Sequence, residues 1–178
     1  DRSLVGSEMC IRDRFEVLEN PGKRSRDELS SAMIALAKFG DEPARVVQLL
    51  ESFFDSKDQE VRETAAIAIG ILGHKAGIET LRGLAWDTPK ARIASARVEI
   101  DLRTRAFAIF GLGLIGHELD PEQESETIDS IADELVKMLG QDHSAIKDLK
   151  VGAITSLGLL PLGEGKFRMD VLPTLERW

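Results

Sequence analysis

The sequence predicts an all-α protein, an α-solenoid of about four antiparallel helix pairs stacked with a right-handed superhelical twist. Segments with one pattern of small and apolar residues recur at intervals of roughly 33 to 47 residues, which is typical of helical repeat arrays. Apolar residues follow helical spacing, and we find no alternating pattern of the kind that indicates a strand. Hydrophobic residues make up 43% and charged residues 30% of the 178 residues, as in a folded domain.

The clearest copy of the repeat is the predicted helix at residues 59–72, with Gly73 beyond it. Three other segments match it when Ala65 is aligned with Ala32, Ala106 and Ala153. In three of the four copies a glycine lies five residues after this alanine. We predict that these glycines allow a neighbouring helix to come close; they are Gly70, Gly111 and Gly158.

This pattern resembles the HEAT-repeat family, in a short form similar to the bilin-lyase-like HEAT repeats. The residues that carry the resemblance are Glu60-Val61-Arg62, Ala65-Ala66, Ala68 and Gly70-Ile71-Leu72-Gly73. The resemblance covers residues 25–178, and it is weakest in the first copy, where Leu29 replaces the arginine. It implies that the second helix of each pair lines the concave side of the array.

The two ends of the sequence are treated separately from the repeats. Residues 1–14 resemble a translated sequencing adaptor, so we interpret them as a non-native segment that contains the single cysteine, Cys10. The repeat domain then covers residues 15–178. Its last residues stop within the repeat pattern, so we expect the chain to be a fragment of a longer array, with an uncovered apolar end that favours self-association.

In the first half, Ser25 and Glu28 form a capping-box pattern that begins a helix at residues 26–39, which Gly40 ends. Residues 41–43 begin a second helix. A further capping-box pattern at Ser56 is predicted to begin the helix at 59–72. A shorter helix follows at residues 76–86, and we interpret its Trp86 as a packing residue between repeats.

In the second half, residues 88–101 form the longest insertion between repeats, predicted as a partly helical connector. A helix is expected at 100–115, followed by a loop that contains His117. Asp120 and Pro121 are predicted to begin a long helix that ends near Gly140. Helices are also expected at 144–160 and from residue 167 onward.

The net charge of −8 argues against general binding to DNA or RNA, because an acidic chain repels the phosphate backbone. Aromatic residues amount to only 5%, too few for a base-stacking surface. The longest apolar run, residues 106–116, is about half of the roughly 20 residues that a membrane span requires. We therefore expect no nucleic-acid or membrane partner and a cytoplasmic location.

Two groups of charged residues are candidate sites. Residues 90–105 carry five basic and two acidic side chains, a net charge of +3, on an insertion of the kind that often forms the binding face of a repeat array. The candidate partner-binding residues are Arg92, Arg97, Arg103 and Arg105. A solvated connector is the alternative. An acid-x-base pattern at the start of the repeated helices predicts a structural ladder between repeats, formed by Glu60, Arg62, Asp101, Arg103, Asp148 and Lys150.

Signals of catalysis and cofactor binding are weak. The stretch Gly111–Gly116 matches G-x-G-x-x-G, but it ends a helical pattern, whereas dinucleotide sites place this motif between a strand and the start of a helix. The histidines, His74, His117 and His143, do not cluster in a ligand pattern; only His117 is followed by Glu, as in HEAT-like di-iron hydroxylases. We predict no catalytic residue, no cofactor and no metal site.

The sequence therefore predicts a non-catalytic scaffold that binds a protein or peptide, with an acidic segment as the expected partner. One alternative is the repeat part of a bilin-lyase-like or other enzyme whose active groups lie outside this chain. A third possibility, phosphate or nucleic-acid binding through the arginines of the insertion, is disfavoured by the net charge.

Overall fold

The computed structural model describes residues 13–140 and 147–176, and all regular structure in these residues is helical. A helix at residues 13–19 precedes α2 (Arg26–Phe39), α3 (Pro43–Glu51) and α4 (Gln59–Ile71). A 3₁₀ turn at Lys75–Gly77 leads into α5 (Ile78–Ala85), which is followed by α6 (Pro89–Ala94), α7 (Leu102–Glu118), α8 (Ser125–Leu139) and α9 (Lys147–Leu159). The last helical segment consists of α10 (Glu164–Lys166), a π-helical turn at Phe167–Val171 and α11 (Leu172–Leu175).

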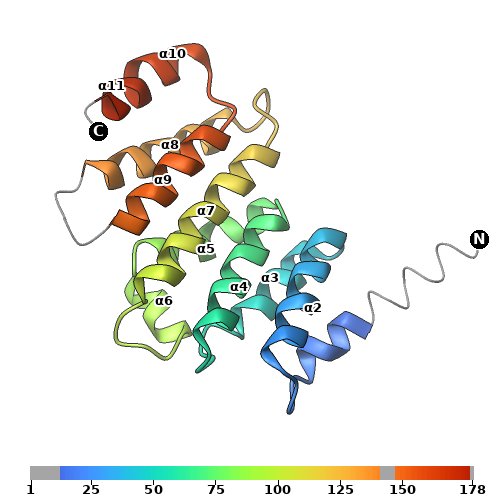
Figure 1. Ribbon diagram of the computed structural model, residues 1–178. Helices are drawn as coiled ribbons and strands as arrows, with labels where there is room; N and C mark the ends of the chain where they lie inside the picture. The colour runs from blue at the N-terminus through green and yellow to red at the C-terminus, as the bar shows by residue number, and fades with distance from the viewer. Residues whose placement is uncertain (1–12, 141–146, 177–178) are drawn as a thin grey trace, which may run out of the picture.

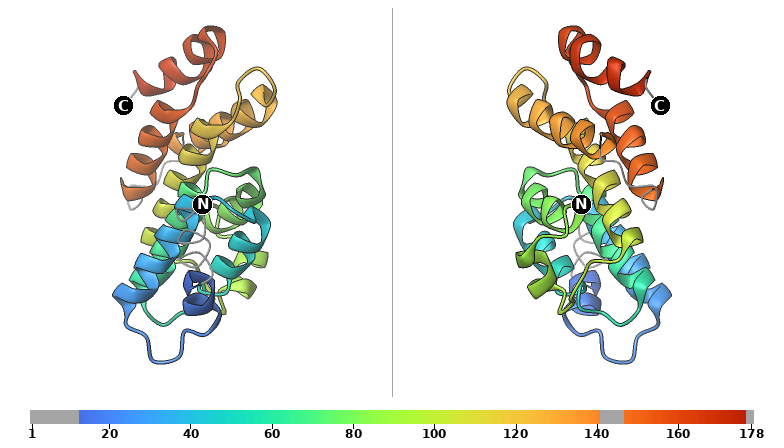
Figure 2. Two further views of the ribbon diagram at one scale, coloured as in Figure 1. Left: turned by 90° about the vertical axis from the view of Figure 1, so that its right-hand side faces the viewer. Right: turned by 90° about the vertical axis from the view of Figure 1, so that its left-hand side faces the viewer.

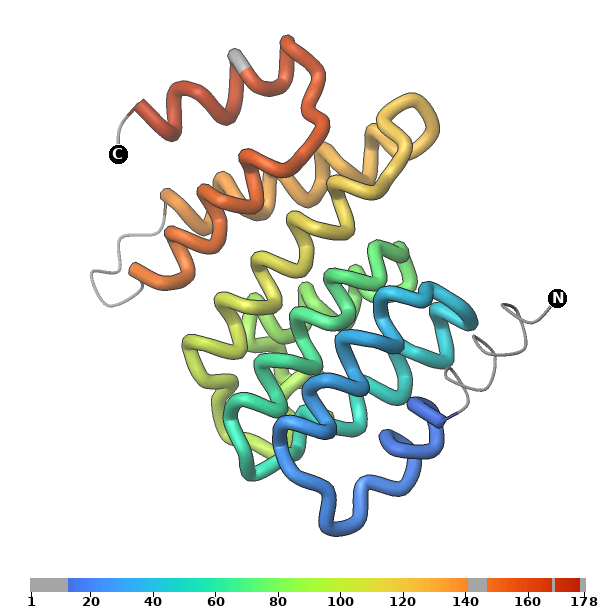
Figure 3. The backbone as a smooth tube through the Cα atoms, turned by 45° about the vertical axis from the view of Figure 1, so that its right-hand side comes forward, coloured from blue at the N-terminus to red at the C-terminus, as the bar shows by residue number. Residues whose placement is uncertain are grey.

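The helices form two layers. The front layer consists of α2, α4, α7 and α9, each packed against the next, and Figure 1 shows them side by side. The back layer contains α3, α5 and α8, which pack against α4, α7 and α9 respectively, and Figure 2 shows the two layers edge-on. The front-layer helices run in the same direction (Figure 3). The predicted array of helix pairs is therefore confirmed as an α-solenoid, and its superhelical hand stays a prediction.

The sequence signals at the ends of α2 have the expected structure. The Ser25 hydroxyl accepts a hydrogen bond from the Glu28 backbone, and the Glu28 carboxylate accepts one from the Ser25 backbone, which completes the capping box. Hydrogen bonds that the Glu28 carboxylate accepts from the Ser25 backbone and hydroxyl hold the pKa of Glu28 below its usual range. Gly40 ends the helix with a φ of 72°, a left-handed conformation that glycine adopts without strain.

The prediction that Ser56 caps the next front-layer helix is wrong. Asp58 caps α4, because its carboxylate accepts a hydrogen bond from the Glu60 backbone. The Ser56 hydroxyl instead accepts a hydrogen bond from the backbone of Asp58, two residues later, in the loop before α4. Aspartate and serine are about equally good capping residues, so the sequence pattern alone did not separate the two positions.

Two further boundaries differ from the sequence prediction. The third repeated helix, α7, continues to Glu118, so His117 lies in its last turn and not in a loop. Helix α8 begins at Ser125, later than expected, because Asp120 caps a separate turn through the backbone of Glu122 and the side chain of Gln123.

Small residues set the spacing of the front layer. A Cβ atom placed on Gly70 would lie 2.4 Å from the Cα atom of Gly111, so α4 and α7 touch through their backbones. Between α7 and α9, a Cβ on Gly113 would lie 2.7 Å from the Cα atom of Ser156. The predicted role of Gly158 is wrong. This glycine is exposed, and a Cβ atom placed on it would meet no atom of another helix within 4 Å. Glycine is needed only where another backbone approaches.

The helical segment at residues 164–175 lies beside α8. Val171 is fully buried, and Lys166 pairs with Asp133 of α8 at 2.5 Å. Phe167 and Met169 stay exposed, 39% and 78% respectively. The prediction that this segment mediates self-association is not tested. None of the described helices is both long and apolar enough to cross a membrane.

Candidate protein-interaction surfaces

Arg92, the first arginine of the basic insertion, has an intramolecular partner. Its guanidinium donates two hydrogen bonds to Asp87, at 2.9 and 2.5 Å. The same carboxylate accepts a hydrogen bond from the Ile100 backbone at 2.9 Å. These contacts hold the pKa of Asp87 below its usual range, with the Arg92 hydrogen bonds as the main cause. Asp87, just after the end of α5, therefore holds both Arg92 of α6 and the loop that follows α6.

The other three arginines also contact the protein itself. Arg97 donates to the backbone carbonyl of Ser56 at 2.8 Å, and Arg105 donates to the carbonyl of Ala85 at the end of α5. Arg103 donates to Glu63 of α4 at 3.0 Å, yet 64% of its side chain stays exposed. Arg103 thus remains the most accessible of the three. Partner binding by the four arginines stays a prediction.

Charged contacts join the first turns of neighbouring front-layer helices. Arg26 of α2 lies 2.9 Å from Glu60 of α4, and Arg62 of α4 lies 3.1 Å from Asp101, which caps α7. Arg62 is only 5% exposed, and it also donates to the carbonyls of Ser56 and Lys57.

The other ladder residues have different surroundings. Arg103 contacts Glu63 of the preceding helix. Asp148 lies exposed in the first turn of α9, and Lys150, two residues later, is half-buried. The predicted structural ladder across all repeats stays a prediction.

Acid is expected to weaken the packing of the insertion. Because the pKa of Asp87 is lowered in the folded protein, its ionised form stabilises the fold above the unfolded pKa of about 4, and this contribution is lost as the pH falls through the folded value. Urea unfolding between pH 6 and pH 2 should show a smaller acid-induced loss of stability for Asp87→Asn than for the unmodified protein. Equal losses would contradict the assigned role of this carboxylate.

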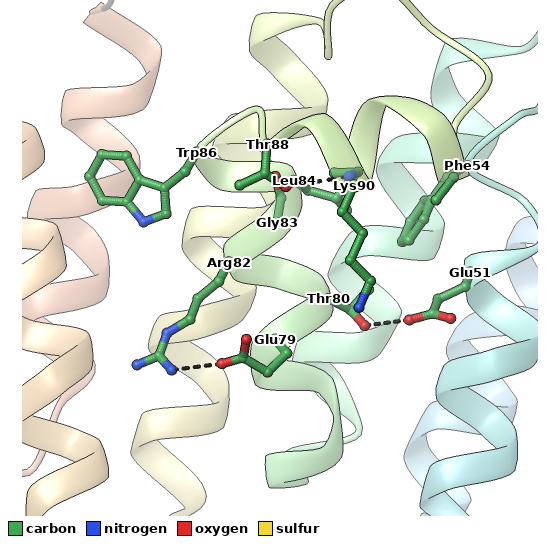
Figure 4. A pocket seen from close by; sticks show the side chains of 12 residues that line it. Glu51, Phe54, Glu79, Thr80, Arg82, Gly83, Leu84, Trp86, Thr88 and Lys90 are labelled. Atoms are coloured by element: carbon green, nitrogen blue, oxygen red, sulfur yellow. Dashed lines mark hydrogen bonds and ion pairs between the residues drawn. The ribbon is translucent and has the colours of Figure 1, made fainter.

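A pocket of about 430 Å³ lies in the back layer, between α3, α5 and α6 (Figure 4). Phe54 and Leu84 contribute apolar surface to it, and Lys90 extends along it. The Thr80 hydroxyl donates a hydrogen bond to Glu51 at its edge. The pocket therefore combines apolar surface with the basic Lys90 and two acidic residues, Glu51 and Glu79.

Trp86 and Arg82 border the same pocket but point away from it toward α8 (Figure 4). Both donate hydrogen bonds to Glu134, the indole at 3.4 Å and the guanidinium at 3.1 Å. The half-buried Trp86 thus packs between repeats, which is the role that we predicted for it.

The outer side of the front layer is apolar. Residues 107, 110 and 114 of α7 share one side of the helix, as do residues 151 and 154 of α9. The opposite sides of both helices are buried, with Leu112 and Ala153 in the core. Since the helices are parallel and turn the same side to the back layer, their uncovered stripes lie on one surface. We call this surface the apolar face; its residues are Ile67, Phe107, Phe110, Leu114, Val151 and Ile154.

The apolar face is most exposed on α9, where Val151 is 63% and Ile154 is 37% accessible. The residues on α4 and α7 are half-buried. Sequence reasoning missed this face because α7 is apolar on all sides, which is typical of a buried helix. The useful signal was the size of the side chains: small residues mark the packed sides of α7, whereas two phenylalanines lie on the open side.

Negative charge is concentrated in residues 118–134, outside the apolar face. Residues 118–134 contain eight acidic side chains and no lysine or arginine, so this segment carries the whole net charge of −8. It runs from the end of α7 through the first two-thirds of α8. Three of the acids pair with bases of other elements: Glu124 with Lys75, Glu134 with Arg82 and Asp133 with Lys166. The charge of this segment disfavours contact with nucleic acid on this side.

The G-x-G-x-x-G stretch and the histidines, which are the sequence features closest to a cofactor or metal motif, have structural surroundings of other kinds. The glycines of the G-x-G-x-x-G stretch lie in the second half of α7 and not at its N-terminus, and Gly111 and Gly113 pack against α4 and α9. His117 contacts the carbonyl of Leu159 at 3.0 Å, and His143 lies outside the described residues. Among residues 13–140 and 147–176, no three metal-binding side chains of the His, Cys, Asp or Glu type converge.

The fold and its surfaces define the class of protein, an all-helical repeat scaffold. The family model for HEAT repeats matches residues 15–100. These residues belong to the HEAT-repeat family, and α7 to α9 continue the same packing beyond them. HEAT repeats generally mediate protein interactions, through the extended surfaces that stacked repeats create. Among curated proteins, no sequence matches this chain.

Proposed function

We propose that this chain is a non-catalytic scaffold that binds another protein or a peptide on the apolar face. One observation supports this most strongly: three neighbouring helices, α4, α7 and α9, turn large apolar side chains to solvent on one surface. Contiguous exposed apolar surface on a folded protein commonly marks an interaction site. Phenylalanine contributes large contact area to such sites with little loss of conformational freedom.

The proposal is tested by selecting peptides from a displayed random library on the intact chain and measuring their affinity for variants. Val151→Asp combined with Ile154→Asp places charge on the apolar face and should weaken binding roughly tenfold or more. The matched control is Ile93→Asp on α6, since Ile93 is 81% exposed but lies away from this face. Binders that retain full affinity for the double variant, or a selection that yields no binder, would contradict the proposal.

A further inference from the structure

We propose that the segment held by the apolar face is an amphipathic α-helix of a partner protein, which lies across the front layer with its acidic end over α7 and α9 and its basic end over α2 and α4. This inference rests on the proposed function, because it describes the occupant of the same face. It adds the conformation, the charge pattern and the direction of the bound segment.

A helical occupant follows from the backbone chemistry of the surface. The front layer is helical, so its backbone N–H and C=O groups are already bonded within α2, α4, α7 and α9. An extended segment pressed onto this surface would lose its hydration without gaining partners for its own backbone, and unpaired buried polar groups are costly. An α-helix bonds its backbone groups internally and offers only side chains to the surface.

The dimensions of the layer suit a helix of ordinary length. Packed helices have axes about 8–10 Å apart, so the distance from α2 to α9 across three such steps is about 25–30 Å. A helix of about 18 residues has this length. Ile34 is half-buried at the equivalent position of α2, and it extends the apolar surface to the first helix of the layer.

The direction follows from a row of charges along one border of the apolar face. On the solvent-facing side of each front-layer helix, a charged side chain lies near the N-terminal end, about one turn before the uncharged residues of that side. Across the layer the signs of these four residues run acidic, acidic, basic, basic, and the residues are Asp27 of α2, Glu60 of α4, Arg103 of α7 and Lys147 of α9. Side chains of opposite sign lie beside them: Arg26 pairs with both Asp27 and Glu60, Glu63 pairs with Arg103, and the exposed Asp148 follows Lys147.

These charges are accessible to a partner. The side chain of Asp27 is 83% exposed, and Lys147 is also exposed. Glu60 and Arg103 each contact a neighbouring helix, yet they leave 55% and 64% of their side chains in solvent. A helix with opposite charges at its two ends would match this row in one direction and meet like charges in the other, and such complementarity fixes orientation.

The experiment uses a synthetic 18-residue amphipathic peptide as the probe. Its apolar residues follow helical spacing, its polar positions carry lysine in the first half and glutamate in the second half, and a nitroxide label is attached at the glutamate end. The protein carries ¹³C-labelled isoleucine methyl groups. We expect the label to broaden the Ile154 methyl signals on α9 more strongly than those of Ile34 on α2. A twin peptide with glutamine at all charged positions should bind roughly threefold to tenfold more weakly at low salt and broaden both signals to the same degree.

A charge-swapped variant, Asp27→Lys with Lys147→Glu, supplies the matched control, because both side chains are exposed and distant from the core. With this variant the stronger broadening should move to Ile34. Equal broadening of Ile34 and Ile154 by the charged peptide, or an unchanged direction with the swapped variant, would overturn the inferred orientation and leave the proposed function in place. Failure of both peptides to bind, or equal binding to the Val151→Asp, Ile154→Asp variant, would instead count against the apolar face itself and with it this inference.

Discussion

The variant Asp101→Ala is expected to lose about 4 kcal/mol of unfolding free energy. Asp101 caps α7 through the backbone of Thr104, and it is the ion-pair partner of Arg62, whose side chain is only 7% exposed. Removal of a cap costs about 1 kcal/mol. Removal of one member of a buried ion pair costs about 3–5 kcal/mol, because the remaining charge stays buried without its partner.

The matched control is Asp58→Ala, which removes the cap of α4. Asp58 is exposed and pairs with no buried arginine, so about 1 kcal/mol is expected. Chemical denaturation of both variants, with Arg62→Met alone and together with Asp101→Ala, forms a double-mutant cycle for the ion pair. Equal losses for the two aspartate variants would show that Arg62 and Asp101 contribute little to the contact between repeats.

The variant Gly70→Ala is expected to destabilise the protein by about 3 kcal/mol, although alanine is the better helix former. The added Cβ atom would lie 2.4 Å from the Cα atom of Gly111 and 3.0 Å from its carbonyl oxygen. Because these are backbone atoms of a second helix, no side chain can rotate away, and α4 and α7 must move apart. Differential scanning calorimetry or urea unfolding measures the loss.

Gly158→Ala is the control for the same substitution in the same layer. Its added methyl group would meet no atom within 4 Å, so only the helix propensity changes. We expect a gain of about 0.5–1 kcal/mol. If Gly70→Ala and Gly158→Ala change the stability in the same direction, close approach of backbones does not explain Gly70.

The sequence predicted the fold class because repeats make each signal appear several times. The patterns around Ala65, Ala106 and Ala153 agree with one another, and each lies in a front-layer helix whose neighbours are also repeats. An error in one cap, such as Ser56 in place of Asp58, changes neither the predicted start of the helix at Gln59 nor the order of the helices.

The sequence correctly predicted that Gly70 and Gly111 pack, but it was wrong about Gly158. Gly70, Gly111 and Gly158 occupy the same position in the alignment, but helix packing depends on the crossing of two helices and not on one helix alone. From α7 to α9 the close contacts involve Gly113 and Gly152 instead. The alignment therefore identified the repeat but not the register in which α9 lies against α7.

The candidate site was harder to predict than the fold, because charge counting does not show which charges are already paired. The net charge of residues 90–105 is +3, yet Arg92, Arg97 and Arg105 each contact a partner within the protein. Their distant partners, Ser56 and Ala85 among them, are backbone carbonyls that no sequence pattern marks. The proposed binding surface instead consists of apolar residues to which the sequence analysis assigned no role.

The most direct test of the proposed interaction surface is an NMR titration of isoleucine-labelled protein with a peptide selected on the intact chain. Binding at the apolar face should shift the methyl signals of Ile67 and Ile154, which lie on it, and leave those of the fully buried Ile69 and Ile109 nearly unchanged. Shifts confined to Ile78 on α5 or Ile93 on α6, in the back layer, with Ile67 and Ile154 unaffected, would contradict the assignment of the apolar face as the binding surface.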